Sequence, residues 1–124
     1  MAEWASLPEG LRNSNFEAAD HIVEKLREIG CTVHKVRDSK VREIRFAPRE
    51  VETMAEMEHG RWTAERLLQG WRRGEKRDPD RRISPYLVSW AQLADDVKEQ
   101  DRRMVRKIPE LLAREGLEIR RDTR

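Results

Sequence analysis

The chain has one cysteine, few aromatic residues and no long apolar run, and each of these shortages excludes something. Cys31 is the only cysteine among 124 residues, so no disulfide can form within the chain. Because Cys31 follows Gly30 at an apolar position, we expect it to be buried in packing. No apolar stretch approaches the roughly 20 residues that span a bilayer, and the first residues form no apolar signal region. We therefore expect a cytoplasmic protein with no membrane partner.

The chain also has no large excess of positive or negative charge. Charged residues make up 40% of the chain, yet 26 Lys and Arg against 24 Asp and Glu leave a formal net charge of +2. This balance argues against duplex nucleic acid as the partner, because duplex binders present extended positive surfaces. Positive charge is local instead: residues 72–82 hold six basic and three acidic side chains. A compact anionic ligand fits this distribution better than a long phosphate backbone.

The sequence carries no pattern typical of catalysis. It contains no phosphate-binding loop, no dinucleotide fingerprint and no nucleophile elbow. The nearest acid–base pair is His59 with Glu58 or Asp78, a combination that any chain this rich in charge offers by chance. With one cysteine and three scattered histidines, no zinc-type ligand cluster is visible. We expect no enzyme activity, no metal and no cofactor.

Three of the four tryptophans surround the basic segment, and this is the most informative feature of the chain. Trp62 and Trp71 enclose a helical run, and Trp90 follows the basic loop. An aromatic face can stack a base, and arginine donates paired hydrogen bonds to phosphate oxygens. The alternative is that the tryptophans are core residues and the loop is a solvated charge run.

The first thirty residues resemble the last thirty. Laying residues 4–33 over residues 90–119 without gaps gives seven identities, which include Trp4 with Trp90 and Gly30 with Gly116. Each copy reads as a leading tryptophan, a turn, a helix, a glycine cap and a short strand. The pattern predicts two domain parts, a partial repeat over 1–47 and a complete repeat over 48–124, that together form one compact domain.

The expected fold is mainly α with minor β, with a pseudo-two-fold internal repeat. A helix is predicted from Pro48 to a stop at Gly70, and another over about 96–115 with a kink or break at Pro109. The segments 32–36 and 41–46 read as a short hairpin or two extended arms. Residues 117–121 are expected to pair with 32–36, and 70–86 to form no regular element.

The region from residue 52 to residue 120 also carries a series of spaced residues that is typical of one family. The series comprises Glu58, His59, Arg61, Trp62, Ala64–Arg66, Gly70, Trp71, Asp78, Asp80, Pro85–Val88, Trp90, Leu93, Asp101, Arg102, Leu111, Leu112 and Gly116. It resembles the RyR domain, a repeat named after ryanodine receptors and found also in bacterial, archaeal and phage proteins. The chain departs from the family at Arg72–Gly74, where an aromatic usually precedes the glycine, and at Ser84, where histidine is common.

The resemblance implies a ligand site around Trp62. In ryanodine receptors the corresponding repeats hold an adenine nucleotide against a tryptophan at this kind of position. Arg66 lies one helical turn from Trp62 and shares its face. The expected ligand-binding residues are His59, Trp62, Arg66, Trp71 and Tyr86, with Arg72, Arg73, Arg81 and Arg82 as candidate phosphate clamps and Asp20 and His21 as candidate polar contacts.

These observations predict a module that binds a nucleotide-derived molecule and has no catalytic activity. The candidates are an adenine nucleotide, an ADP-ribose-type molecule and a cyclic oligonucleotide. The resemblance to microbial and phage RyR domains suggests a sensor or a sequestering protein, in phage defence or its evasion. We also expect a weak homodimer, because two basic loops would repel unless an anionic ligand lay between them. The alternative is a structural or protein-interaction repeat without a small ligand. A weaker alternative is a nucleic-acid binder that uses the basic loop and the tail.

Overall fold

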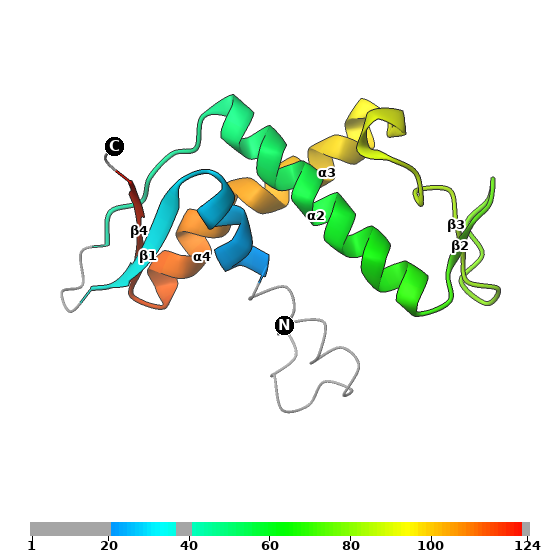
Figure 1. Cartoon of the computed structure of the whole chain (residues 1–124), viewed down its shortest axis with the longest axis horizontal. Coiled ribbons are helices and arrows are strands. Elements are labelled where there is room, and N and C mark those ends of the chain that lie inside the picture. Colours follow the sequence, from blue (N-terminus) through cyan, green and yellow to red (C-terminus); the bar gives the residue numbers. More distant parts are fainter. Residues whose placement is uncertain (1–20, 37–40, 123–124) are drawn as a thin grey trace.

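The computed structural model describes residues 21–36 and 41–122 and shows a small, mainly helical domain with short strands (Figure 1). The long helix α2 (Pro48–Leu68) runs across the molecule, and α3 (Asp95–Arg106) crosses behind it. The strands β1 (Cys31–Lys35) and β4 (Leu117–Arg121) lie with α4 (Ile108–Arg114) at one end. The strands β2 (Arg72–Arg73) and β3 (Ile83–Ser84) lie at the other end. The prediction of a mainly helical domain with short strands is confirmed.

Helix α2 begins and ends where the sequence predicted. Pro48 stands in its first turn, where a missing N–H costs nothing, and the Ala47 N–H donates to Glu50 Oε1 at 2.7 Å. At the other end Gly70 has φ +86°, a conformation that glycine adopts without strain and that ends the helix. Its buried face carries Val51, Met54, Ala55, Glu58 and His59.

The predicted break near Pro109 is confirmed. Helix α3 ends at Arg106, and α4 starts at Ile108 with Pro109 in its first turn. Proline has no N–H to donate and its ring clashes with the preceding turn, so one continuous helix over 96–115 cannot form.

The predicted pairing of the strand ends is also confirmed. Strands β1 and β4 pair antiparallel, with Val33 opposite Ile119. Residues 41–46 form no strand, so the hairpin interpretation of 32–46 is wrong. The Arg42 N–H instead donates to Glu118 Oε1 at 3.0 Å, so a side chain of β4 satisfies a backbone group that a hairpin would have paired.

The core lies between β1, β4, the helical residues 21–28 and the helices α2, α3 and α4. Its buried members are Leu26, Cys31, Phe46, Val51, Met54, Ala55, Val105, Ile108 and Ile119. Cys31 is packed as expected, and burial raises the pKa of its thiol. No helix in the described part of the chain is long and apolar enough to cross a membrane.

The basic loop after α2 is more regular than predicted. Strands β2 and β3 pair in parallel, and Asp78 and Ile83 exchange backbone hydrogen bonds of 2.9 Å in each direction. The expectation of no regular element over 70–86 is therefore wrong. The short strands form because Gly74 lets the backbone approach Ile83 closely, a contact that no periodicity of polar residues indicates.

Candidate functional site

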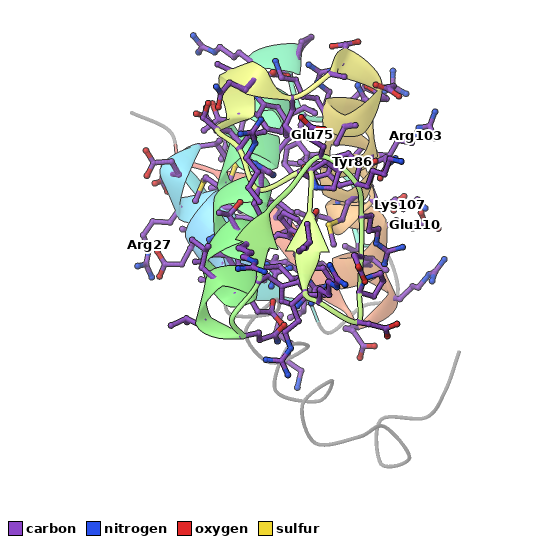
Figure 2. The ribbon with its side chains drawn as sticks, turned by 90° about the vertical axis from the view of Figure 1, so that its right-hand side faces the viewer. Arg27, Glu75, Tyr86, Arg103, Lys107 and Glu110 are labelled. Carbon is purple, nitrogen blue, oxygen red and sulfur yellow. The ribbon has the colours of Figure 1, made fainter. Side chains whose placement is uncertain are left out.

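A cavity of about 430 Å³ lies between α2, α3 and the loop that contains β2 and β3. Its lining residues come from three segments: Glu58, His59, Arg61, Trp62 and Arg66 from α2; Trp71, Arg77, Ser84 and Tyr86 from the loop; and Val97, Gln100, Asp101 and Met104 from α3. Figure 2 shows the molecule from the loop end, with Tyr86 between α2 and α3. The volume is in the range of small-molecule sites.

The aromatic wall of the cavity consists of Trp62 and Trp71 with Arg66 beside both. The Arg66 guanidinium carbon lies 5.7 Å from the Trp62 ring centroid and 5.2 Å from that of Trp71. These distances are within the range of cation–π attraction. Arg66 also donates to Gln69 Oε1 at 3.1 Å on the exposed side. A planar cation therefore lies against both indole rings of this wall.

Beneath this wall lies a buried ion network. Lys25 Nζ contacts Glu58 Oε2 at 2.6 Å, and the two side chains are only 3% and 4% exposed. Arg61 joins Glu58 at 2.6 Å and Glu65 at 2.8 Å. Burial pushes the pKa of Glu58 upward, but the hydrogen bonds from Arg61 and Lys25 outweigh it and hold that pKa below its ordinary value. The network fixes the base of the cavity and leaves its charges mutually compensated.

His59 links the aromatic wall to the following loop. Its Nε2 donates to the Val88 carbonyl at 2.6 Å, and its ring lies nearly parallel to Trp62, with centroids 5.8 Å apart and an interplanar angle of 20°. Because Nε2 carries the proton in this bond, Nδ1 is the acceptor in the neutral ring. His59 is buried, so it orients Trp62 more than it reaches into the cavity.

Asp101 supplies a different kind of group on the α3 side. Within residues 21–36 and 41–122, its carboxylate has no hydrogen bond or ion pair. Burial raises the pKa of Asp101, and the charge of Glu58 raises it further. The cavity thus combines an aromatic wall, an uncompensated carboxylate and the arginines Arg66 and Arg77.

The structure brings together five of the sequence-predicted site residues. His59, Trp62, Arg66, Trp71 and Tyr86 all line the cavity. Trp90 has a structural place instead: it packs against the core, and its Nε1 donates to Glu52 Oε1 at 3.1 Å.

The four candidate phosphate clamps do not line the cavity. Arg72 and Arg73 are exposed in β2, and the Arg81 side chain is 77% exposed and lies 3.7 Å from Asp78. Arg82 has φ +56° and donates to the Gln69 carbonyl at 2.8 Å. Arg77, next to the Asp78–Ile83 bridge in the sequence, lines the cavity in their place.

Of the Asp20–His21 pair, Asp20 lies outside the described residues, as do Trp4 and the segment 13–15. His21 is half-buried near the network, and burial lowers its pKa, with Lys25 as the second cause. Its Nδ1 is buried and has no hydrogen-bond partner in the part of the chain that the structure describes.

Sequence reasoning about the site missed Arg77 and the α3 side. Val97, Gln100, Asp101 and Met104 follow each other at three- and four-residue steps, which places them on one helical face. That spacing was visible in the sequence, but a mixed polar and apolar face does not distinguish a cavity wall from a solvated surface.

One comparison with known proteins bears on this chain. A family model described as the RyR domain matches residues 45–121, a span that contains every residue lining the cavity.

Proposed function

The chain belongs to the RyR domain family, and we propose that it is a non-enzymatic binding module that captures a nucleotide-derived molecule in the cavity between α2 and α3. The observation that carries the proposal is the wall of Trp62 and Trp71 beside Arg66, in a cavity of about 430 Å³. An aromatic ring can stack against any base, and arginine can donate paired hydrogen bonds to a phosphate. An adenine nucleotide, an ADP-ribose-type molecule or a cyclic oligonucleotide meets both demands.

Binding requires Arg66 to exchange one partner for another. In the structure its guanidinium lies against both indole rings and bonds Gln69 on the exposed side. A base that enters would take the ring face, and the guanidinium would turn to the anionic group of the ligand. The exposed Gln69 contact is the only direct bond that this motion breaks among the described residues, so the exchange is energetically small.

Heating the purified protein to release what it carries from cells, followed by mass spectrometry, tests the proposal. A nucleotide-derived compound in the supernatant, which quenches tryptophan fluorescence when added back, supports it. If nothing is released, and no member of a panel of mono-, cyclic and ADP-ribosyl nucleotides changes the fluorescence, the structural-repeat alternative is correct. Sensing or sequestration of such a signal, in phage defence or its evasion, is the role that the family resemblance suggests.

The finer architecture that we propose is a pseudo-two-fold internal repeat. Residues 21–28 form a helix that leads to Gly30 at φ +76° and β1, and α4 leads to Gly116 at φ +71° and β4. The two strands pair antiparallel with Val33 opposite Ile119, and these are the residues that the sequence alignment of the two copies matches. A two-fold axis through that pair would exchange the copies. An experimental structure in which residues 21–35 superpose on 107–121 no better than unrelated helix–strand units would remove the repeat.

A further inference from the structure

We propose that the Asp101 carboxylate is the acceptor that identifies the ligand, by receiving two adjacent hydrogen-bond donors. The donors would be the N1–H and the 2-amino group of a guanine base, or the 2′- and 3′-hydroxyls of a ribose. This inference rests on the proposed function and deepens it, because it assigns a recognition group to the α3 side of the cavity.

Asp101 lines the cavity from helix α3. It lies in α3 with Gln100 as its neighbour, and Val97 and Met104 are one helical turn away on either side. All four line the same cavity as Trp62 and Trp71. A planar ligand on the indole wall therefore presents an edge toward α3.

Asp101 differs from the other acidic residues of this region, because they have basic partners. Glu58 and Glu65 are held by Arg61, and Glu52 by Arg102 at 2.8 Å. Asp78 at the loop contacts Arg81 at 3.7 Å. Asp101 is partly buried and is the member of this set that has no such partner in the described ranges. A buried acceptor without a donor is costly, so a ligand that supplies donors there gains that free energy on binding.

The two oxygens of a carboxylate match a pair of neighbouring hydrogen-bond donors on a ligand. An ionised carboxylate offers two oxygens that only accept, so it fits two neighbouring donors. The guanine edge and a ribose cis-diol each provide such a pair. Adenine offers a single amino group beside ring acceptors, which would face the carboxylate with repulsion. A site built to bond a donor discriminates strongly against analogues that lack it.

The charged residues that line the cavity also determine the orientation of the bound ligand. Asp101 lies on the α3 side, whereas Arg77 belongs to the loop and Arg66 to the last turn of α2. Phosphates are attracted to the arginines and repelled by the carboxylate. The ligand would therefore point its donor edge toward α3 and its anionic group toward the loop.

Calorimetric titration of wild type and Asp101→Asn with GMP, IMP, XMP, AMP and their 2′-deoxy forms tests the assignment. Asparagine keeps the shape but replaces one acceptor by a donor. For the guanine edge, wild type should bind GMP about 10-fold or more tighter than IMP, and Asp101→Asn should prefer XMP to GMP. For the ribose, wild type should bind GMP and AMP alike, lose about 10-fold on either 2′-deoxy form, and lose that discrimination in Asp101→Asn.

Two comparisons keep the test decisive. Asp96→Asn, an exposed position in the first turn of α3 that does not line the cavity, should bind as wild type. If Asp101→Asn binds every nucleotide as wild type does while Trp62→Ala loses binding, the Asp101 assignment is wrong and the proposed function stands. If wild type binds none of these mononucleotides, the Asp101 assignment is wrong, and the broader panel of cyclic and ADP-ribosyl nucleotides decides on the proposed function.

Discussion

At the scale of single residues, Arg66 occupies the position that decides whether the cavity is open. Its guanidinium is within 6 Å of both indole centroids, at 5.7 Å from Trp62 and 5.2 Å from Trp71. Guanidinium is planar and weakly hydrated, so it stacks on an indole much as a base does. We propose that the same side chain covers the rings in the free protein and pairs with a phosphate when the ligand binds.

Arg66→Ala should weaken nucleotide binding by roughly 1.5–3 kcal/mol, because a charged hydrogen bond to the anionic group is lost. The melting temperature should stay near that of wild type, since the Gln69 contact is exposed. Titration calorimetry measures the first effect and a thermal melt the second. Tighter binding by Arg66→Ala would show that Arg66 only blocks the rings and holds no ligand group.

The fold depends on the buried charge of Glu58. It compensates Lys25, which is 3% exposed, so its loss leaves a buried ammonium without a counter-charge. Glu58→Gln should cost roughly 3–5 kcal/mol of unfolding free energy. The matched control Glu110→Gln removes an exposed pair with Arg114 and should cost less than about 1 kcal/mol. Urea denaturation of both variants checks the difference, and equal costs would contradict the role given to Glu58.

The same carboxylate predicts a pH dependence. Because the pKa of Glu58 is lower in the folded state, its stabilisation is present above its ordinary pKa of about 4.5 and is lost as pH falls through the folded value. Wild type should therefore lose stability below about pH 4.5 more steeply than Glu58→Gln. Denaturation midpoints measured from pH 3 to pH 7 compare the two slopes, and parallel profiles would refute this assignment.

The residues of the aromatic wall were predictable, and the Asp101 carboxylate on the α3 side of the cavity was not. Trp62 and Arg66 share a helix face, so their proximity follows from sequence spacing alone. Arg77 and Asp101 depend on how a loop folds back and how α3 crosses α2, which are tertiary facts. Composition located the positive charge in the loop but could not tell which of its arginines turn toward the cavity.

At the scale of elements, glycines in α2 and in the loop have opposite effects. Gly60 lies inside α2 with nothing within 4 Å of an added Cβ, whereas at Gly74 the added atom would overlap Ile83 Cγ2. Gly60 is therefore a weak point of the helix, and Gly74 is required for the pairing of β2 with β3.

Gly60→Ala should raise stability by about 1 kcal/mol, because alanine is the better helix former. Gly74→Ala should instead distort the loop, move Arg77 and weaken nucleotide binding, with its larger effect on binding. Thermal melts and titrations of the two variants form a matched pair. A Gly74→Ala protein that binds as wild type would show that the loop geometry does not matter for the site.

The helices were predictable because proline and glycine residues in the sequence indicate where they start, end or break. Pro48, Gly70, Pro109 and Gly116 each constrain the backbone at a boundary, and all four lie where a helix starts, ends or breaks. The strands were harder to predict, because a strand forms only where a second segment pairs with it. The β1–β4 pairing followed from the matched strand ends, but nothing local indicated that 41–46 stay unpaired or that β2 and β3 form.

At the scale of the whole molecule, the loop that contains β2 and β3 and the β1–β4 pair lie at opposite ends (Figure 1). The cavity is lined by that loop and by the second half of α2, so it lies toward the loop end and away from the β1–β4 pair. The core and the buried ion network occupy the space between them. The fold therefore supports the site from one side and leaves the loop, with its positive charge, facing solvent.

We propose that two chains meet through these loops and that an anionic ligand between them tightens the contact. Residues 72–82 carry six basic and three acidic side chains, so two such loops repel unless a negative charge lies between them. Light scattering should show a weak homodimer that becomes stronger when ligand is added. A monomer under both conditions would exclude the dimer without affecting the site in a single chain.

The central claim is that Trp62 is a ligand platform, and the most direct measurement is the paired melting and binding of Trp62→Ala. Loss of stacking should weaken nucleotide binding by roughly 1–3 kcal/mol while the protein melts as wild type. A tryptophan that belongs to the core would instead cost roughly 3–5 kcal/mol of stability when removed. The account predicts a folded variant that has lost nucleotide binding. A variant that unfolds, or one that folds and binds as wild type, would contradict it.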